Sequence, residues 1–428
     1  MNGNVEQVET VIIGGGHAGL TMSYFLRQPG LEHVVLERGR VAERWISERW
    51  DSFYFQFPNW TIELPGYKYQ YEDPDGFAPG GEIVRIIQEY ANFIKAPVRC
   101  GVNVTALESS SNSTRYLLRT NAGTIEASNV VIATGERERG IIPPFSSDVP
   151  NDIRQLHSSG YRNAGELPPG AVLVVGSGAS GFQIAEDLHQ NGRQVYVCMG
   201  RHRRVARRYR GRDYSWWGVE LGLYERRRAE LPATSQNGSS ISRGALLTGV
   251  NGGYEADWRD LDSKGIALLG RLKAIQGAKL ALAPDLDDNL AKGDEWLANY
   301  KKTVDDYIAK NKLDVPEQSA SESSPSLEGS ASAPILELDL RAAGITSIIW
   351  ATGFGNDYDW LKLPLLDERG EPSHERGVTQ FPGIYFLGLR WLYKQKSAFL
   401  SYGGPAEDAA YLAEQIAARH SQSSSWSS

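Results

Sequence analysis

The chain has 428 residues, of which 41% are hydrophobic and 23% charged, and its net charge of −7 argues against a protein built to bind nucleic acid. This length allows two or three domains with cores of ordinary size. The two cysteines, Cys100 and Cys198, are far apart and form no CxxC motif, so we expect two buried thiols and no disulfide. Residues 1–9 are polar and no apolar run is long enough for a bilayer, so we expect no signal peptide, no membrane contact and a cytoplasmic protein.

The first unit along the chain combines two apolar runs, a glycine-rich turn and a helix. Residues 8–13 form a mainly apolar run that ends at Gly14, and residues 14–19 read Gly-Gly-Gly-His-Ala-Gly. Residues 18–26 have helical character, and residues 33–36 are mainly apolar again. This order predicts a parallel β-α-β unit. The turn fits the GxGxxG pattern, in which the glycines permit a tight turn, a close approach of pyrophosphate, and packing of the helix on the strand.

Glu37 follows the second apolar run and bears on which nucleotide this unit accepts. A carboxylate there accepts hydrogen bonds from a ribose 2′-OH and repels a 2′-phosphate, which favours FAD or NAD over NADP. His17 stands at a variable position of the turn, and we expect it to fill space rather than to catalyse. The predicted contacts of this first nucleotide site are Gly14, Gly16, His17, Ala18, Gly19 and Glu37.

Between this unit and the next, the spacing of apolar residues predicts a helix and three strands. The helix covers residues 82–94, and the strands cover residues 98–104, 116–119 and 129–133.

The glycine pattern returns 162 residues later, counted from Gly14 to Gly176. A predicted strand at 171–175 leads into the sequence Gly-Ser-Gly-Ala-Ser-Gly, and a helix at 182–190 and a strand at 194–199 follow. This repeat predicts a second nucleotide-binding domain. Its predicted contacts are Gly176, Ser177, Gly178, Ala179, Ser180, Gly181, Arg201 and Arg204.

The second unit has no acid at the position that matches Glu37, and a run of seven arginines between Arg201 and Arg212 follows instead. Arginine holds phosphate through paired, charge-assisted hydrogen bonds, so we predict NADPH at the second unit. A nucleic-acid contact and a solvated basic face are the alternatives. We expect Arg201 first to meet the 2′-phosphate, and the other arginines to form surface or interdomain pairs.

The remaining elements complete both domains. Residues 214–231 and 284–311 predict helices that form an insertion in the second domain, and the serine-rich stretch 319–332 predicts a flexible loop. The last predicted elements are strands at 347–351 and 383–387, a helix at 406–418, and an irregular tail.

The order of these motifs resembles the class B flavoprotein monooxygenases, which include flavin-containing, auxin-forming, N-hydroxylating and Baeyer–Villiger enzymes and bacterial flavoproteins labelled as potassium-transport-associated. The likeness includes His157 and Tyr161, which match the second half of the family pattern FxGxxxHxxx followed by an aromatic residue. Asn151 and Ile153 stand where that pattern has Phe and Gly. Tyr161 in place of Trp favours the heteroatom-oxidising or auxin-type branch.

The resemblance implies roles for residues outside the glycine turns. His157, Tyr161 and Gln56 are the candidate catalytic residues, although for His157 we favour an interdomain hydrogen bond. Leu389 stands where the family has an aspartate. Candidate pocket walls are Phe55, Trp216, Trp217, Trp391, Tyr393 and Phe399. The further cofactor contacts that the resemblance implies are Arg38, Arg44, Trp45, Trp50, Gln56, Val104, Thr134, Gly135, Ala351, Thr352, Gly353 and Gly388.

The resemblance also implies an architecture: an α/β fold of two nested Rossmann-like dinucleotide-binding domains, in the three-layer arrangement of glutathione reductase. The chain leaves the FAD domain after the Thr134-Gly135 segment and returns near Thr352-Gly353. We place the FAD domain at 1–160 and 341–418, the NADPH domain with its helical insertion at 161–340, and a disordered tail at 419–428.

The activity that the resemblance implies is FAD-dependent, NADPH-using monooxygenation. One oxygen atom of O2 enters a small organic substrate through a C4a-(hydro)peroxyflavin. The alternatives are an NADPH-dependent flavin reductase or oxidase, a disulphide reductase, which needs a cysteine pair that the chain lacks, and a flavin-bound regulatory protein without enzyme activity. The sequence has no cluster with metal-ligand spacing, and it leaves open whether the protein is a homodimer.

Overall fold

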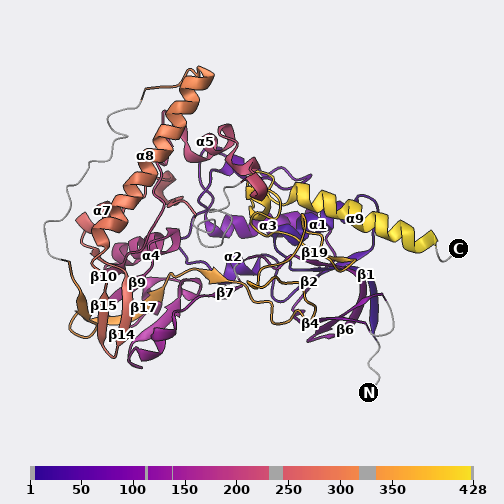
Figure 1. The fold of residues 1–428 in the computed structure, drawn as a ribbon, viewed down its shortest axis with the longest axis horizontal. Helices are drawn as coiled ribbons and strands as arrows, with labels where there is room; N and C mark the ends of the chain where they lie inside the picture. Colours follow the sequence, from indigo (N-terminus) through magenta and orange to yellow (C-terminus); the bar gives the residue numbers. More distant parts are fainter. Residues whose placement is uncertain (1–4, 111–113, 137, 231–243, 318–333, 426–428) are drawn as a thin grey trace.

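The computed structural model describes residues 5–110, 114–136, 138–230, 244–317 and 334–425, and in them the chain forms two lobes, each centred on a sheet (Figure 1). The mixed α/β class and the two Rossmann-like units expected from the glycine turns are confirmed. No helix among the described residues is both long enough and apolar enough to cross a membrane.

The first sheet has seven strands in the order β3-β2-β1-β6-β5-β4, with β19 beside the end of β6. The strands β3, β2, β1, β6 and β19 run parallel, and β4, β5 and β6 form an antiparallel meander. Buried apolar residues join this sheet to α1 and α9 in one core. The strands are β1 (Glu6–Ile13), β2 (His33–Glu37), β3 (Val98–Cys100), β4 (Val104–Ser109), β5 (Tyr116–Thr120), β6 (Gly123–Ile132) and β19 (Ile384–Phe386).

Three helices precede the second sheet. They are α1 (His17–Arg27), α2 (Glu43–Ser47) and α3 (Gly80–Phe93). The inward face of α3 carries apolar residues three or four positions apart, as the sequence pattern predicts. The predicted strand at 98–104 is divided into β3 and the start of β4, because Gly101 adopts a left-handed conformation with φ +74°.

The second sheet has five parallel strands in the order β13-β10-β9-β17-β8. The helices α4 (Ala179–Gln190) and α7 (Trp258–Ser263) pack against it, and a three-stranded antiparallel sheet covers further apolar residues. The parallel strands are β8 (Arg154–His157), β9 (Ala171–Val175), β10 (Val195–Cys198), β13 (Ala267–Leu269) and β17 (Ile345–Trp350). The antiparallel ones are β14 (Leu272–Gln276), β15 (Lys279–Leu282) and β16 (Glu337–Asp339).

Two adjacent crossings connect the lobes (Figure 1). The outgoing strand β7 (Arg139–Gly140) pairs antiparallel with the returning strand β18 (Phe354–Gly355). Because β8 and β17 pair with each other in the second sheet, sheet membership divides the chain near 139–140 and 354–355. The divisions we set at 160 and 340 differ from these crossings, since they leave β8 and β17 with the first domain.

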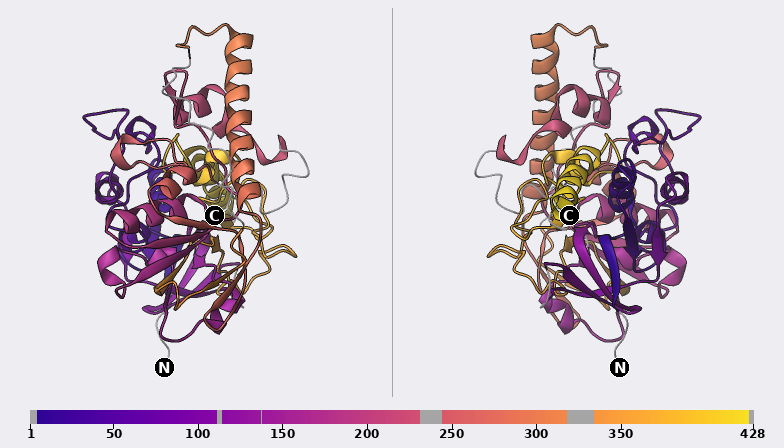
Figure 2. Two further views of the ribbon diagram at one scale, coloured as in Figure 1. Left: turned by 90° about the vertical axis from the view of Figure 1, so that its left-hand side faces the viewer. Right: turned by 90° about the vertical axis from the view of Figure 1, so that its right-hand side faces the viewer.

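The insertion in the second lobe contains the hairpin strands β11 (Arg208–Tyr209) and β12 (Arg212–Asp213), and the helices α5 (Tyr214–Glu220) and α8 (Leu286–Asn311). Figure 2 shows α8 rising above the two sheets. The helix predicted at 284–311 is confirmed, but that predicted at 214–231 ends at Glu220, because Gly222 is left-handed with φ +62°. Short 3-10 turns follow it, and the serine-rich stretch 319–332 lies outside the described residues.

Two further expectations need correction. The last helix, α9, spans Ala406–Ser425, so the expected disorder from residue 419 is wrong up to 425, and residues 426–428 lie outside the described part. Cys198 is buried as expected, whereas Cys100 is exposed, because β3 is an edge strand that ends there.

Candidate functional site

The first glycine turn leaves a helix N-terminus open. Gly14 has φ +115°, and its amide donates to the carbonyl of Leu36 at 2.8 Å. A Cβ on Gly19 would lie 1.9 Å from the carbonyl oxygen of Gly14, so only glycine lets α1 pack so closely on the turn. A Cβ on Gly16 would meet nothing within 4 Å, and no side chain caps α1. The free amides of this turn and the positive end of α1 suit a phosphate group.

Glu37 fixes the other end of this site. Its side chain is buried, and its Oε2 accepts a hydrogen bond from the amide of Gly15 at 2.7 Å, while Oε1 accepts one from Gly39 at 2.8 Å. A Cβ on Gly15 would lie 2.9 Å from the Glu37 Cβ, which explains a third glycine in the turn that the GxGxxG pattern does not require. The amide of Val102 donates to the Glu37 carbonyl at 2.9 Å, so the segment before Val104 borders the site.

The second glycine turn repeats this backbone. Gly176 has φ +122°, and its amide donates to Cys198 at 3.0 Å. A Cβ on Gly181 would lie 2.0 Å from the Gly176 carbonyl oxygen, and one on Gly178 would meet nothing within 4 Å. The Ser177 hydroxyl donates to the carbonyl of Gly200 at 2.7 Å and accepts from its amide at 3.0 Å. The backbone of this turn is therefore held by the neutral hydroxyl of Ser177, whereas that of the first turn is held by the carboxylate of Glu37.

The two arginines predicted for the second site differ in their surroundings. Arg201 is exposed directly after Gly200 and makes no ion pair with another residue in the described ranges. Arg204 is only 5% exposed, and its guanidinium pairs with Glu255 at 2.8 Å, Asp257 at 2.7 Å and Asp294 at 2.8 Å. Because three carboxylates already surround Arg204, its guanidinium is less available to a phosphate than that of Arg201.

Two Ala-Thr-Gly segments, which begin at Ala133 and Ala351, lie behind the glycine turns. The amide of each alanine donates to the last residue of the strand that leads into the turn, at 2.9 Å in both domains. A Cβ on Gly14 would lie 2.5 Å from the Ala133 oxygen, and one on Gly176 would lie 2.3 Å from the Ala351 oxygen. The sequence signals of turn and segment therefore belong to one structural unit that occurs twice.

His157 joins the two crossings. Its Nε2 lies 2.9 Å from the carbonyl oxygen of Gly353, which can only accept, so Nε2 carries the proton. Its Nδ1 lies 2.9 Å from the Ser159 hydroxyl, and its ring meets Phe354 edge-on. Burial lowers the pKa of His157, so the imidazole stays neutral near pH 7. This arrangement favours a role in fixing the crossing segments over proton transfer, although the bond to Gly353 lies within the second lobe and not between the domains.

Tyr161 also binds within the protein. It is fully buried, and its hydroxyl donates to Asp187 Oδ2 at 2.5 Å. The hydroxyl of Ser52, from the first domain, donates to the other oxygen of Asp187 at 2.6 Å. Burial, and then the Asp187 carboxylate, raise the pKa of Tyr161. We therefore assign Tyr161 to the domain interface.

The loop after β2 brings further predicted residues to the first site. Arg44 pairs with Glu48 at 2.8 Å, and a Cβ on Gly135 would lie 3.8 Å from the Arg44 Nη1. Arg38 lies 4.0 Å from the same glutamate. Two other residues predicted to contact the cofactor, Trp45 and Trp50, pack around Phe53. The predicted contact Thr134 adjoins Gly135 in the sequence.

The C-terminal part reaches the first glycine turn as well. The Nε2 of His17 lies 3.2 Å from the Ala398 carbonyl oxygen, in the 3-10 turn η10 (Gln395–Ala398). Burial lowers the pKa of His17 to about 4, so the ring is neutral. A Cβ on Gly388 would lie 2.6 Å from the Ala18 Cβ, so Gly388 packs directly against α1.

The interface between the first domain and the insertion, which we call the seam, contains residues that the sequence did not predict as site residues. Arg207 is 1% exposed, and its Nη1 donates to the Gln56 carbonyl at 2.8 Å. Tyr224 stacks on Tyr402 with ring centroids 3.9 Å apart. The only sequence signal for Arg207 was the arginine run, in which a buried member looks the same as an exposed one.

Four charged side chains fasten the same seam; we call them the lysine–glutamate cluster. Lys394 pairs with Glu225 and Glu407 at 2.6 Å, and Lys396 pairs with Glu225 at 2.5 Å and with Glu407 at 3.3 Å. Glu225 belongs to the insertion and the other three residues to the C-terminal part of the first domain, so the cluster connects the domains away from the crossings.

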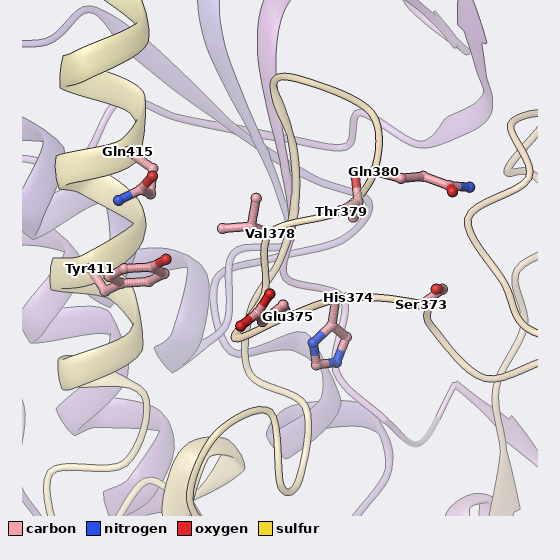
Figure 3. Close-up of a pocket in the computed structure, with 8 residues that line it drawn as sticks. All are labelled: Ser373, His374, Glu375, Val378, Thr379, Gln380, Tyr411 and Gln415. Atoms are coloured by element: carbon pink, nitrogen blue, oxygen red, sulfur yellow. The ribbon is translucent and has the colours of Figure 1, made fainter.

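A surface pocket of about 390 Å³ lies elsewhere, between the turn at 373–380 and α9 (Figure 3). Figure 3 shows Tyr411 and Gln415 on the helix side and Val378 on the turn side. Burial, with the nearby Arg228 charge, lowers the pKa of His374 to about 4. None of the lining residues belongs to the predicted nucleotide sites, so this pocket is separate from them.

Comparisons with known proteins agree with this architecture. Residues 11–217 match the family model of pyridine nucleotide-disulphide oxidoreductases. An uncharacterized CzcO-like oxidoreductase of Geobacillus kaustophilus is 29% identical over 413 residues, which cover 96% of this chain and 98% of that protein.

Two solved structures share the fold. A flavin-containing monooxygenase from Stenotrophomonas maltophilia superposes with a TM-score of 0.63 and 18% identity, over 97% of this chain and 99% of that one. The OTEMO complex with FAD and NADP superposes with a TM-score of 0.55 and 15% identity, over 97% of this chain and 86% of that one. The chain therefore matches the pyridine nucleotide-disulphide oxidoreductase family model through residues 11–217, and over its length it has the fold of the flavin-containing monooxygenases.

Proposed function

We propose that the protein is a monooxygenase that binds FAD at the first glycine turn and NADPH at the second, and transfers one oxygen atom of O2 to a small organic substrate. The assignment of the nucleotides rests on the difference in charge between the residues that border the two glycine turns. The Glu37 carboxylate faces the first, whereas Ser177, Gly200 and the exposed Arg201 border the second. OTEMO, which has this fold, is a complex with FAD and NADP.

The first site fits FAD in shape and charge. The space in front of Gly16 and the uncapped start of α1 suit a pyrophosphate. Glu37 Oε1 and Oε2 lie at the end of β2, where a ribose hydroxyl would be received. Arg44, whose Nη1 lies beside Gly135, would add positive charge near the phosphates.

The second site fits NADPH for the complementary reason. Gly178 has the same open space as Gly16, and no side chain caps α4. A 2′-phosphate would meet no carboxylate from Met199 or Gly200, and Arg201 would hold it.

When bound, FAD supplies the redox chemistry, since it accepts a hydride from NADPH and passes electrons to O2. The residues of the chain contribute position and exclusion of water. His157 fixes the returning crossing through Gly353, and Tyr161 orients Asp187, which accepts a hydrogen bond from Ser52 of the first domain. Phe55, Phe57 and Phe399 form an apolar wall beside Gln56, with Phe57 and Phe399 stacked at 6.1 Å. Such a wall keeps bulk water from the reacting groups.

The cysteines argue against disulphide chemistry, although the matching family model is named for it. Cys100 is exposed at the end of β3, in the first sheet. Cys198 is buried in the second sheet, and burial raises the pKa of its thiol to about 12. Two thiols in different sheets form no redox pair, which leaves an NADPH-dependent flavin reductase or oxidase as the main alternative.

The deciding experiment compares electron use with oxygen transfer. Purified protein is screened with NADPH and a panel of amines, sulfides, phenols, indoles and ketones, and NADPH consumption, H2O2 release and oxygenated product are measured together. A monooxygenase gives at least one substrate with an oxygenated product and reduced H2O2 release. Stoichiometric H2O2 with every substrate would support an oxidase instead, and protein purified without flavin would contradict the proposal.

A further inference from the structure

The start of the long helix α8 lies at the carboxyl ends of two strands of the second sheet. The Nδ2 of Asn289 donates to the carbonyl of Met199, directly after β10, at 3.4 Å. Asp285, the residue before the helix, accepts with Oδ1 a hydrogen bond from the amide of Arg271 at 2.8 Å, just after β13. Nucleotides bind at this edge of a parallel α/β sheet. The insertion therefore borders the second nucleotide site.

The next two turns of α8 follow the start of the arginine run. A Cβ on Gly293 would lie 2.5 Å from the His202 Nε2, so the helix packs closely on this segment. Further along, the guanidinium carbon of Arg203 lies 4.4 Å from the centre of the Trp296 ring. Asn289, Gly293 and Trp296 are four and three positions apart, which places them on one face of a helix. The face of α8 that borders the end of β10 therefore includes Trp296.

The side chains at the start of the arginine run alternate in exposure, as in an extended segment. His202 and Arg204 are each 5% exposed, whereas Arg201 is exposed and Arg203 is half-buried. Successive side chains of an extended segment point to opposite sides, so Arg201 and Arg203 share a side. Because Arg203 meets the indole of Trp296, this ring lies on the same side of the segment as Arg201.

The indole of Trp296 is accessible from solvent and fixed in orientation. It is 45% exposed, and the guanidinium of Arg203 lies over the ring and is attracted to it. A flat aromatic surface with a second guanidinium nearby, that of Arg201, matches a purine base whose ribose carries a phosphate. The base stacks on the ring, and the phosphate pairs with the arginine.

We propose that Trp296 is the platform on which the adenine ring of NADPH stacks, and that Arg203 is the positioning residue that holds the indole. The inference rests on the proposed function, because it extends the second nucleotide site onto the insertion. It also separates two contributions to binding. The 2′-phosphate contact of Arg201 serves NADPH alone, whereas adenine is common to NADPH and NADH, so Trp296 contributes affinity without selectivity.

The test titrates the purified full chain with NADP+ and with NAD+ in a calorimeter, which requires no turnover. We expect Trp296→Ala to raise both dissociation constants by about tenfold, as the loss of one base-stacking contact predicts, and to leave their ratio unchanged. Arg201→Ala should raise the dissociation constant of NADP+ alone. Trp296→Phe, which keeps an aromatic face, should recover most of the affinity.

A second measurement reports the stacking itself. In etheno-NADP+ the adenine ring is fluorescent, and contact with an indole quenches its emission. The natural chain should quench saturating etheno-NADP+, and Trp296→Leu should leave it bright. Leucine keeps an apolar side chain and a high helix propensity on α8, so this variant separates the stacking from the stability of the helix.

The control is Phe93→Ala, because Phe93 is 56% exposed at the end of α3, in the first domain. This variant should bind both nucleotides as the natural chain does. Unchanged affinity in Trp296→Ala, a loss for NADP+ alone, or an equal loss in Phe93→Ala would overturn the platform.

The same titrations separate the platform from the proposed function. A natural chain that prefers NADP+ and is unaffected by Trp296→Ala removes the platform alone. A natural chain without preference, which loses affinity for both nucleotides in Trp296→Ala, removes the 2′-phosphate assignment and keeps the platform. A natural chain that binds neither nucleotide contradicts both.

Discussion

Glu37 and Met199 occupy the same position in the two nucleotide-binding units. Glu37 follows Leu36, whose carbonyl accepts a hydrogen bond from the amide of the turn residue Gly14. In the second unit Met199 follows Cys198, whose carbonyl accepts one from Gly176. The carboxylate of Glu37 binds two backbone amides, whereas Met199 is fully buried and offers no acceptor to a ribose. In our proposal, this one residue in an otherwise repeated backbone separates the two kinds of nucleotide.

Arg201→Ala should remove most of the preference for NADPH over NADH. A lost charge-assisted contact to the 2′-phosphate predicts a fall of about tenfold to a hundredfold in the ratio of the two kcat/KM values. The measurement is the rate of flavin bleaching by each nucleotide.

The matched control for Arg201 is Arg210→Ala, from the same arginine run. Its guanidinium pairs with Asp305 on α8 at 2.9 Å, so it should leave the nucleotide ratio unchanged. An unaltered preference in Arg201→Ala would reject the phosphate assignment.

Glu37→Gln should weaken FAD binding. The amide group of glutamine must turn its NH2 toward Gly15 or Gly39, and one buried backbone amide then loses its acceptor. We expect a dissociation constant for FAD about tenfold to a hundredfold higher, read from the flavin-to-protein absorbance ratio after dialysis. Glu108→Gln, on the exposed part of β4, serves as the control and should retain all its flavin.

Two alanine substitutions in the second glycine turn should separate folding from binding. Gly181→Ala places a Cβ 2.0 Å from a backbone oxygen, so the free energy of unfolding should fall by about 3 kcal/mol. Gly178→Ala meets open space and has φ −77°, so stability should change by less than about 1 kcal/mol while the KM for NADPH rises. Denaturant unfolding and steady-state kinetics measure both, and equal stability losses would contradict the packing argument.

The lysine–glutamate cluster should contribute stability that acid removes. Burial raises the pKa of Glu225 and Glu407, but the lysine ammonium groups outweigh it, and both pKa values lie below the ordinary 4.5. A carboxyl with a lowered folded-state pKa stabilises the protein above pH 4.5, and this contribution disappears as the pH falls through the lowered value.

Glu225→Gln/Glu407→Gln should therefore lower the free energy of unfolding at pH 7, by at most about 1 kcal/mol for each partly exposed pair, and the loss should shrink as the pH falls below 4.5. Asp306→Asn, which breaks the exposed Lys302 pair on α8, is the control with little expected effect at either pH. A loss in the double variant that is as large at pH 3 as at pH 7 would rule out the ionic origin.

The sequence predicts well what depends on local pattern. Both glycine turns, their helices and the strand-end Glu37 follow from short-range spacing, because a tight turn and a close helix leave few alternatives to glycine. The long helix α8 follows from its repeating apolar residues. These features account for the two nucleotide-binding units and their order.

What the sequence does not predict depends on contacts between distant residues. Arg204 and Arg207 belong to a run that looks solvent-exposed, and their burial follows from Asp294, from Phe77 and from Gln56, far along the chain. The sheet membership of β8 is likewise set by its pairing with β17, almost two hundred positions later. No local pattern carries such information.

The paired crossings β7 and β18 and the lysine–glutamate cluster lie at different places between the two lobes. The lobes are therefore attached at two separate places, and a hinge motion about the crossings would have to break the ion pairs of the cluster. Dissolved salt weakens the ion pairs but not the backbone pairing of β7 with β18, so a rise in ionic strength should loosen the junction at the cluster while the crossings stay intact.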